Sequence, residues 1–403
     1  MEKTRAANYI SEVFTQGFER ERFRQFVHEL LNRYDASKSQ PMQVPDAFIQ
    51  HVKSCQRLGT YQSPNGELLD ILIVNVAEDY KIERTRTALR DFVAHKLKRG
   101  DNYKEAALVA FVPPSSKNWR FSYVRMEYET TRDPKTGKIM PEERLTPARR
   151  YSYLVGVDEK SHTAQKQLLS LLADDKQDPE LSTIEQSFSV EKVTKEFFSE
   201  YSRLFESTDK ALADLVHKDK ALKSDFESKN VDTVAFTKKL LGQIVFLYFI
   251  QKKGWLGVPK NGKWGDSPRD FLRHLANKAI QEKKNIFNNV LEPLFYDTLA
   301  TDRGHEALCP TFQCRIPFLN GGLFEPLAGY DWENTEINLP NTLFTNQDKS
   351  SQGDTGTGIL DVFDRYNFTV NEAEPLEKEV AIDPEMLGKV FENLIEENRR
   401  KGL

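Results

Sequence analysis

Two acidic residues and a lysine lie near one another in the chain and have the residue types of a metal-dependent hydrolytic site. Asp70 lies near the start of an apolar run, and Asp79 follows it two positions before Lys81. Two carboxylates can hold a divalent cation, and a lysine can orient or activate the water that attacks a phosphodiester. We therefore predict a catalytic set of Asp70, Asp79 and Lys81, with Asp70 and Asp79 as ligands of one cation.

The same residues also have an ordinary structural interpretation. Any Asp-x-Lys triplet is a weak pattern, and Asp79 comes after the apolar run has ended. In this interpretation Asp70 caps a turn and residues 78–81 form a solvated loop. Carboxylate oxygens lie about 2.0–2.6 Å from a bound cation. Asp70 and Asp79 must therefore face each other if they share one.

Arginine and lysine residues gather in two stretches, one over 82–99 and one over 132–150. The whole chain has a net charge of −4, so binding to nucleic acid would depend on local patches of this kind. The alternative for each stretch is a solvated surface. The residues that we predict to contact DNA phosphates are Arg84, Arg86, Arg90, Lys98, Arg149 and Arg150.

The three cysteines, Cys55, Cys309 and Cys314, have no spacing typical of a disulfide framework. We interpret them as free thiols of a cytoplasmic protein. His305, Cys309 and Cys314 could instead be three metal ligands, although structural zinc normally has four. The start of the chain is polar, and the longest apolar run, 244–250, is far too short to cross a membrane.

The period of the apolar residues changes along the chain and predicts the elements that position these side chains. An Asn-Gly pair at 65–66 predicts a hairpin turn between two strands. The second of these strands is apolar on both faces, which predicts a central place in a sheet. The helices predicted in this half cover 8–34, 45–57 and 82–99, and the strands cover 58–61, 68–76, 106–112, 119–126 and 151–157.

These elements predict a mixed α+β chain of several domains. Residues 1–157 form an α/β domain and 158–188 a polar linker. Residues 189–305 form an all-α helical domain, in which Asp232 begins a central helix and Gly254 ends it. Residues 306–380 form an irregular connector, and 381–403 a helix that begins with Asp383 and Pro384.

Several segments resemble the N-terminal region of type IIG-like fused restriction–modification enzymes, which also carry DNA adenine methyltransferase activity. The resemblance covers essentially the whole chain and is most specific in the segment 317–325 and in 379–392, which is similar to the last part before the family's methyltransferase domain. The other similar segments are 58–61, 69–74, 84–94, 107–112, 119–122 and 367–370.

The resemblance implies a PD-(D/E)xK-like α/β nuclease domain over 1–157, followed by a helical connector. Asp70 matches the aspartate that opens the strand of that motif, whereas Asn75, Val76 and Ala77 supply neither its acid nor its lysine. The resemblance also implies Mg²⁺ as the cofactor and unmodified double-stranded DNA as the substrate, in a phage-defence role. S-adenosylmethionine would bind only in the methyltransferase domain, which this sequence does not include.

Two functions follow from this resemblance. The first is the DNA-cleavage and connector region of such an enzyme, paired with a separate methyltransferase or recognition chain. The second is a catalytically inactive module that docks on DNA or on the methyltransferase. In both cases we expect the segment 319–323 to be a structural turn, because a phosphate-binding loop needs a helix N-terminus and usually a lysine close behind it.

Overall fold

The computed structural model describes most of the chain, which divides into two compact units. Unit 1 comprises residues 1–194 and 371–385, and unit 2 comprises 195–370 and 386–403. In 128–132 and 139–143 only the backbone is described. The residues described are 2–79, 86–98, 103–132, 139–143, 148–174, 176–319, 321–351, 353–370, 376–386 and 388.

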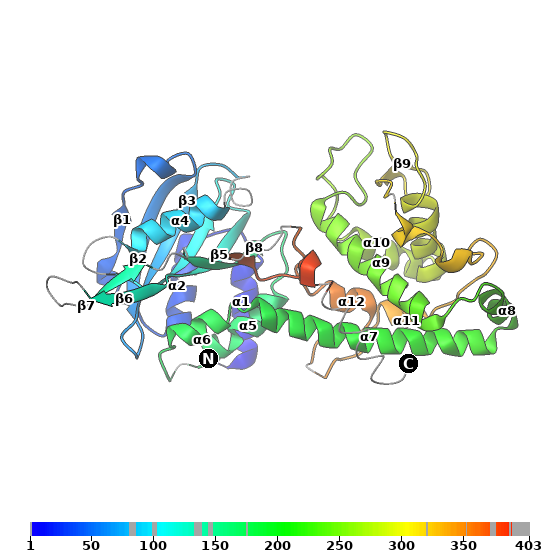
Figure 1. Cartoon of the computed structure of the whole chain (residues 1–403), viewed down its shortest axis with the longest axis horizontal. Coiled ribbons are helices and arrows are strands. Elements are labelled where there is room, and N and C mark those ends of the chain that lie inside the picture. Colours follow the sequence, from blue (N-terminus) through cyan, green and yellow to red (C-terminus); the bar gives the residue numbers. More distant parts are fainter. Residues whose placement is uncertain are drawn as a thin grey trace. The chain divides into compact units, whose positions relative to one another are not determined.

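Seven strands of unit 1 form one mixed sheet (Figure 1). The pairs β3–β4 and β8–β11 are parallel, and the other neighbouring pairs are antiparallel. Two further strands, β6 (Tyr128–Arg132) and β7 (Ile139–Glu143), form a separate hairpin. In sheet order the seven strands are β1 (Gln40–Met42), β2 (Val52–Gln62), β3 (Leu68–Val76), β4 (Ala106–Val112), β5 (Asn118–Arg125), β8 (Arg149–Gly156) and β11 (Glu377–Glu379).

Helices cover both faces of this sheet, as Figure 1 shows. Helix α4 (Arg86–Leu97) buries Leu89, Phe92 and Val93 on one face, together with residues of β3 and β4. On the opposite face, Phe14 of α1 lies 5.6 Å from Phe121 of β5 between ring centroids. The helices on that face are α1 (Lys3–Phe14), α2 (Arg20–Leu31), α5 (His162–Ala173) and α6 (Leu181–Gln186). The sheet is buried on both sides, which explains the apolar character of β3 and β4.

The prediction of a helix over 45–57 is wrong. Only Asp46–Phe48 is helical, as a short 3₁₀ turn, and β2 begins at Val52. Val52, Cys55 and Leu58 are buried at a spacing of three, which imitates a helix. Two register irregularities in the pairing of β2 with β3 produce this spacing within a strand.

The polar linker predicted over 158–188 is also wrong. Helix α5 lies within this range and buries Ala164, Leu168 and Leu171, and it packs on α1. The helix predicted over 8–34 is two helices, α1 and α2. The predicted end of the connector at residue 380 differs as well, because 371–385 belong to unit 1, where β11 pairs with β8.

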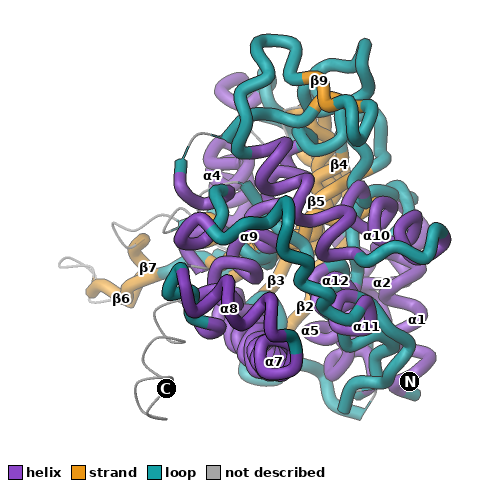
Figure 2. The backbone as a smooth tube through the Cα atoms, turned by 90° about the vertical axis from the view of Figure 1, so that its right-hand side faces the viewer, coloured by secondary structure: helices purple, strands orange, loops and turns teal. Residues whose placement is uncertain are grey.

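Unit 2 is mostly helical, with one short pair of strands in its described part (Figure 2). Phe287–Leu291 and Pro293–Leu299 form π-helix rather than α-helix. The α-helices are α7 (Val190–Lys218, which begins in unit 1), α8 (Lys220–Ser228), α9 (Thr233–Lys253), α10 (Phe271–Gln281), α11 (Asn341–Phe344) and α12 (Ile359–Phe363); the strands are β9 (Leu308–Cys309) and β10 (Cys314–Arg315).

Helix α9 has the boundaries that the sequence predicts. The Asp232 carboxylate accepts the backbone N–H of Ala235 at 2.8 Å, and Gly254 ends the helix at φ 76° in the left-handed region. By length and composition alone α9 could cross a membrane. Most of its side chains are buried inside unit 2, as expected for a central core helix.

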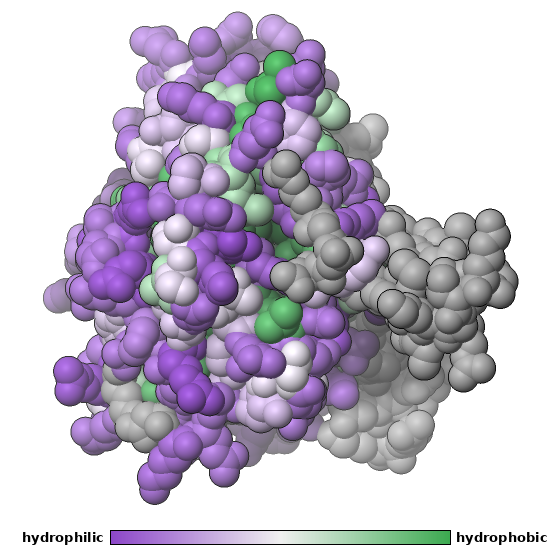
Figure 3. All heavy atoms as spheres, turned by 90° about the vertical axis from the view of Figure 1, so that its left-hand side faces the viewer, coloured by the Kyte–Doolittle hydropathy of each residue, from purple (hydrophilic) through white to green (hydrophobic). Residues whose placement is uncertain are grey.

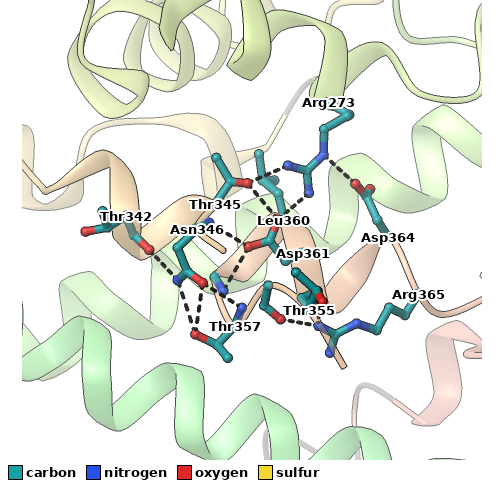
Figure 4. A network of polar contacts seen from close by, with 12 residues as sticks. Arg273, Thr342, Thr345, Asn346, Thr355, Thr357, Leu360, Asp361, Asp364 and Arg365 are labelled. Atoms are coloured by element: carbon teal, nitrogen blue, oxygen red, sulfur yellow. Dashed lines mark hydrogen bonds and ion pairs between the residues drawn. The ribbon is translucent and has the colours of Figure 1, made fainter. Parts of the chain in front are cut away.

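A polar network fixes the irregular segment after α11 (Figure 4). Arg273 of α10 forms ion pairs with Asp361 at 2.9 Å and with Asp364 at 2.6 Å. Asp361 also accepts hydrogen bonds from Thr345, from the backbone of Asn346 and from the backbone of Gly358. These bonds give a segment with little regular structure a defined conformation.

Of the helix predicted over 381–403, the structure describes residues 381–386 and 388. Residues 384–386 and 388 are helical.

Candidate functional site

Asp70 lies near the start of β3, which is the third strand of the sheet counted from the β1 edge. Its neighbours in register are Thr60 of β2 and Ala107 of β4. The side chain is 1% exposed, and a buried carboxylate is stable only with compensating partners. This location agrees with the prediction of a strand-opening aspartate.

Three side chains supply those partners. Lys104, which lies just before β4, forms a hydrogen-bonded ion pair with Asp70 Oδ1. The Thr60 hydroxyl donates to the same oxygen at 2.8 Å, and Arg57 Nη1 lies 3.6 Å from Oδ2. Burial lowers the pKa of Lys104, although its bond to Asp70 opposes this shift. The negative charge of Asp70 is thus balanced by two cationic side chains.

Asp70 lies at the wall of a pocket of about 800 Å³. Among the charged residues that line the pocket, four are cationic and two are acidic, so the lining has a positive balance. The charged lining residues are Asp35, Lys38, Arg57, Asp70, Lys96 and Lys104. A pocket with this charge balance favours anions over cations.

The structure does not bring Asp79 to Asp70, so the predicted sharing of one cation is wrong. Asp79 follows the far end of β3, where its carboxylate accepts the backbone N–H of Ser115 at 2.8 Å. Asp70 and Val76 alone are separated by about 20 Å, at roughly 3.3 Å per residue of strand. Lys81 lies outside the described residues.

The described residues, as they are arranged, do not form a metal centre. They include no group of three His, Cys, Asp or Glu side chains suited to holding a metal ion. Asp35 is the other carboxylate at the pocket, and it already accepts bonds from the backbone and hydroxyl of Ser37. Both oxygens of Asp70 face cationic partners, so Mg²⁺ could bind Asp70 only if those partners moved.

Two of the predicted DNA contacts are buried instead. Arg150 is 1% exposed and Arg90 is 5% exposed. Both lie within 3.7 Å of the carboxylate of Glu377 on β11, and the guanidinium of Arg150 lies over the ring of Phe111. Burial in these ion pairs removes both arginines from contact with phosphates, so the prediction is wrong for them.

The remaining predicted DNA contacts have different locations. Arg149 is exposed and forms an ion pair with Glu127 at 3.0 Å. Arg86 and Lys98 are half-buried at the two ends of α4, and Arg84 lies outside the described residues. Figure 3 shows that hydrophilic residues predominate among the coloured atoms on this face of the molecule, with hydrophobic ones scattered between them. Arg149, Arg86 and Lys98 are not among the residues that line the Asp70 pocket.

The alternative metal site at the cysteines receives no support from the described residues. Cys309 and Cys314 are buried free thiols that lie opposite each other in the β9–β10 pair. His305 is exposed, and no group of three potential ligands occurs in the described ranges.

In the segment 319–323, the carbonyls of Gly322 and Leu323 accept hydrogen bonds from side chains of α9. The helical turn there has only three residues, as expected for a structural turn.

Sequence reasoning missed Lys104, Arg57 and Thr60. A usable signal was present for Lys104, because β3 and β4 are parallel and begin at the same edge of the sheet. Residues just before one such strand therefore lie beside the first residues of the other. Thr60 could be found from the hairpin register, whereas the irregularity between Arg57 and Gly59 conceals the direction of Arg57.

Comparison with known proteins shows a sequence similarity over about half of the chain. The chain is 29% identical over 240 residues to a protein of Methanocaldococcus jannaschii named "Putative type II restriction enzyme and methyltransferase". The alignment covers 53% of this chain and 18% of that protein, so the chain spans under a fifth of the relative's length. This similarity relates the chain to restriction–modification enzymes. No family model and no solved structure matches the chain.

Proposed function

We propose that this chain is the DNA-cleavage and connector region of a restriction–modification enzyme that defends its host against phage. The observation that carries the proposal is the similarity to the M. jannaschii protein, together with the pocket of positive balance at Asp70. In this proposal unit 1 is a PD-(D/E)xK-like nuclease domain that contacts double-stranded DNA. Unit 2 is the helical connector to a methyltransferase, which alone would bind S-adenosylmethionine.

The pocket supports a contact with the DNA backbone rather than with bases. Lysine and arginine side chains neutralise phosphates without reading sequence. Lys38, Arg57 and Lys104 line the pocket, so each can contribute to binding that falls as salt rises. Specific readout needs side chains that fit base edges in the grooves, and we assign that role to a separate methyltransferase or recognition chain.

Cleavage in this proposal depends on Mg²⁺ and on Asp70. Mg²⁺ would supply stabilisation of charge on the leaving oxygen. The part played by this chain is to present a buried carboxylate at a phosphate-binding pocket. Because Lys104 and Arg57 balance Asp70 in the described arrangement, we expect the isolated chain to cleave DNA poorly or not at all until a partner or the substrate changes that arrangement.

A second function, an inactive module that docks on DNA or on a methyltransferase chain, is favoured by one observation. The described residues place one carboxylate, Asp70, among cations and leave Asp79 at the other end of β3. A site of this kind binds phosphate without hydrolysing it. Cleavage and docking on DNA make different predictions for nicking and the same prediction for DNA binding, whereas docking on a methyltransferase chain requires neither.

The test is nicking of unmodified supercoiled plasmid by the full chain in Mg²⁺, with and without a methyltransferase chain of a restriction–modification system. The control variant is Asp70→Asn, which keeps the size of the side chain and removes its charge. The cleavage proposal predicts nicking that the Asp70→Asn variant lacks. DNA binding without nicking under any of these conditions would support docking on DNA instead. The absence of DNA binding would contradict both cleavage and docking on DNA, and would leave only docking on a methyltransferase chain.

A further inference from the structure

We propose that unit 2 carries a binding surface for single-stranded DNA at the end of α9, where an exposed tryptophan lies among cationic side chains. This Trp264 surface is formed by Lys253, Trp255, Lys260, Lys263, Trp264 and Arg315. The inference goes beyond the proposed function, which gives unit 2 only a connecting role, and it uses no residue of the Asp70 pocket. It rests on the proposed function only in taking the strand to be DNA.

The centre of the surface is a pair of tryptophans. Trp264, in the loop between α9 and α10, is 40% exposed. Its ring centroid lies 6.4 Å from that of the half-buried Trp255, at an interplanar angle of 66°. An aromatic ring buries a large apolar area when a partner covers it, so the exposed part of Trp264 is available to a flat ligand. A single exposed hydrophobic residue is ordinary, and the proposal therefore depends on what surrounds this one.

The loop that presents Trp264 is fixed to two elements, α9 and the β9–β10 pair beside it (Figure 1). Val258 and Arg315 exchange backbone hydrogen bonds of 2.9 and 2.7 Å. The backbone N–H of Gly265 donates to the carbonyl of Gly254, which ends α9, at 2.8 Å. A Cβ at Gly254 would lie 2.5 Å from the carbonyl oxygen of Gly265, so the loop is seated closely on the helix end. A preformed site of this kind loses less conformational freedom on binding than a flexible loop does.

Two cationic side chains lie over the tryptophan rings. The guanidinium of Arg315 is 4.7 Å from the ring centroid of Trp264, and the amine of Lys253 is 4.0 Å from that of Trp255. Arg315 also donates to the backbone carbonyl of Gly262 at 2.9 Å, which fixes its place. Attraction to the rings holds these charges beside the exposed aromatic surface.

The loop itself has an excess of positive charge. Residues 252–270 include five lysines and arginines and two aspartates, whereas the whole chain has a net charge of −4. Lys260 and Lys263 are exposed. The carboxylate of Asp266 accepts the backbone N–H of Lys263 at 2.8 Å, which holds the turn before Ser267. Exposed cations of this kind neutralise phosphates.

The combination of rings and cations favours a single strand over a duplex. Cations alone neutralise the phosphates of either form. A base can stack on an exposed ring only when it is unpaired, because the bases of a duplex are already stacked on one another. Cationic surfaces with aromatic rings bind single strands with little regard to sequence, since every base has a π-face. A base on Trp264 would leave Lys260, Lys263 and Arg315 to contact phosphates of the same strand.

The first experiment compares the affinity of the full chain for a mixed-sequence single strand and for the duplex of the same sequence, without divalent ions. We expect Trp264→Leu to bind the single strand about tenfold more weakly than the wild type, as for the loss of one stacked base, and to bind the duplex within about twofold. Trp264→Tyr keeps an aromatic ring and should recover most of the affinity. Phe246→Leu removes another exposed ring of unit 2, 38% exposed, and as the matched control should not change binding.

The second experiment follows tryptophan fluorescence as the single strand is added. A base stacked on Trp264 quenches the emission of that ring. The wild type should therefore show quenching that Trp264→Leu lacks and that Phe246→Leu keeps.

The third experiment is a salt series with the single strand. The double variant Lys260→Met with Lys263→Met should lower the salt slope by about 1.4, at 0.7 per phosphate contact of a single strand. The double variant Lys210→Met with Lys218→Met is an equal change of charge at exposed positions of α7, and its slope should match the wild type. Thermal melting of each variant separates these effects from loss of folding.

The outcomes distinguish this inference from the function on which it rests. No binding of the single strand by the wild type, or equal weakening of single-strand and duplex binding by Trp264→Leu, would overturn the inference. Unchanged single-strand affinity in folded Trp264→Leu, or an unchanged salt slope in the Lys260 and Lys263 variant, would overturn it as well. Tighter binding of an RNA of the same sequence than of the DNA would overturn the assignment to DNA. Failure to nick plasmid would contradict the cleavage function alone and would leave these results in place.

Discussion

At the scale of single residues, the site depends on contacts that sequence spacing does not show. Asp70 is predictable, because an acidic residue near the start of an apolar strand is unusual and suggests a role. Its partner is not the lysine two positions after Asp79 but Lys104, which parallel strand pairing brings to the same edge. The prediction of phosphate contacts in the arginine clusters was wrong in part for a related reason. The sequence alone does not distinguish the buried Arg150 from the exposed Arg149.

Glu292, which lies between the two π-helical stretches of unit 2, gives a prediction of this scale. It is 2% exposed and accepts a hydrogen bond from the Tyr330 hydroxyl at 2.7 Å. Burial raises its pKa to about 8, so the folded protein binds a proton there that the unfolded chain releases near its ordinary pKa of 4.5. The stability contributed by this group is therefore complete below about pH 4.5 and is lost as pH rises toward about 8.

The variant Glu292→Gln keeps an acceptor for Tyr330 and removes the titration. We expect its melting temperature to match the wild type near pH 5 and to exceed it above pH 8. The measurement is the difference between the two melting temperatures across this range, which cancels the titration of other groups. A difference that does not change with pH would contradict the prediction.

At the scale of elements, helix ends and central strands follow the sequence closely, whereas irregular strands and distant pairings do not. The cap at Asp232 and the stop at Gly254 are local chemistry. The sequence pattern does not predict the full extent of strand β2, because its irregular register gives the buried residues a helical spacing. Strand β11 escapes because it has three residues and pairs with β8, over 200 positions earlier in the chain.

The attachment of β11 can be tested through a buried ion pair. Arg120 of β5 donates two hydrogen bonds to one oxygen of Glu379, each 3.0 Å long, and both side chains are almost fully buried. Removing one partner of such a pair costs about 3–5 kcal/mol, because the other charge stays buried and loses its close counter-charge. We expect Glu379→Gln to lower the free energy of unfolding of unit 1 by an amount of that order, measured by urea denaturation.

The control for this prediction is Glu29→Gln on an exposed face of α2, where a change within about 0.5 kcal/mol is expected. The double variant Arg120→Met with Glu379→Met should be less destabilised than Glu379→Gln alone, since both buried charges are then removed together. Equal stability of Glu379→Gln and Glu29→Gln would show that β11 does not depend on this pair.

The N-cap of α9 provides a smaller and more local test. Asp232→Ala removes the acceptor of the Ala235 N–H, and loss of such a cap costs about 0.5–2 kcal/mol. Asp232→Ser should recover most of this loss, because serine also caps well. Stability equal to the wild type in Asp232→Ala, measured by the same denaturation, would mean that solvent replaces the cap without cost.

At the scale of the whole molecule, the amino-acid sequence predicts the mixed α/β class and the order of the α/β and helical regions along the chain. It does not predict the residues at which these regions begin and end. Unit 1 takes its last strand from 371–385, between the two segments of unit 2, a return of the chain that no local pattern shows. Function at this scale rests on similarity over 53% of the chain to a restriction enzyme and methyltransferase. We propose in addition that the pocket at Asp70 is where DNA binds.

The measurement that tests this account most directly is the affinity of the full chain for random duplex DNA across a salt series. It compares the wild type with a variant carrying Lys38→Met and Arg57→Met in the pocket, and with Lys53→Met and Lys117→Met as an equal charge change outside it. The account predicts weak binding whose salt slope falls by up to about 1.8 in the pocket variant, at 0.9 per contact, and stays constant in the control. Equal slopes in all three proteins, or no DNA binding by the wild type, would contradict it.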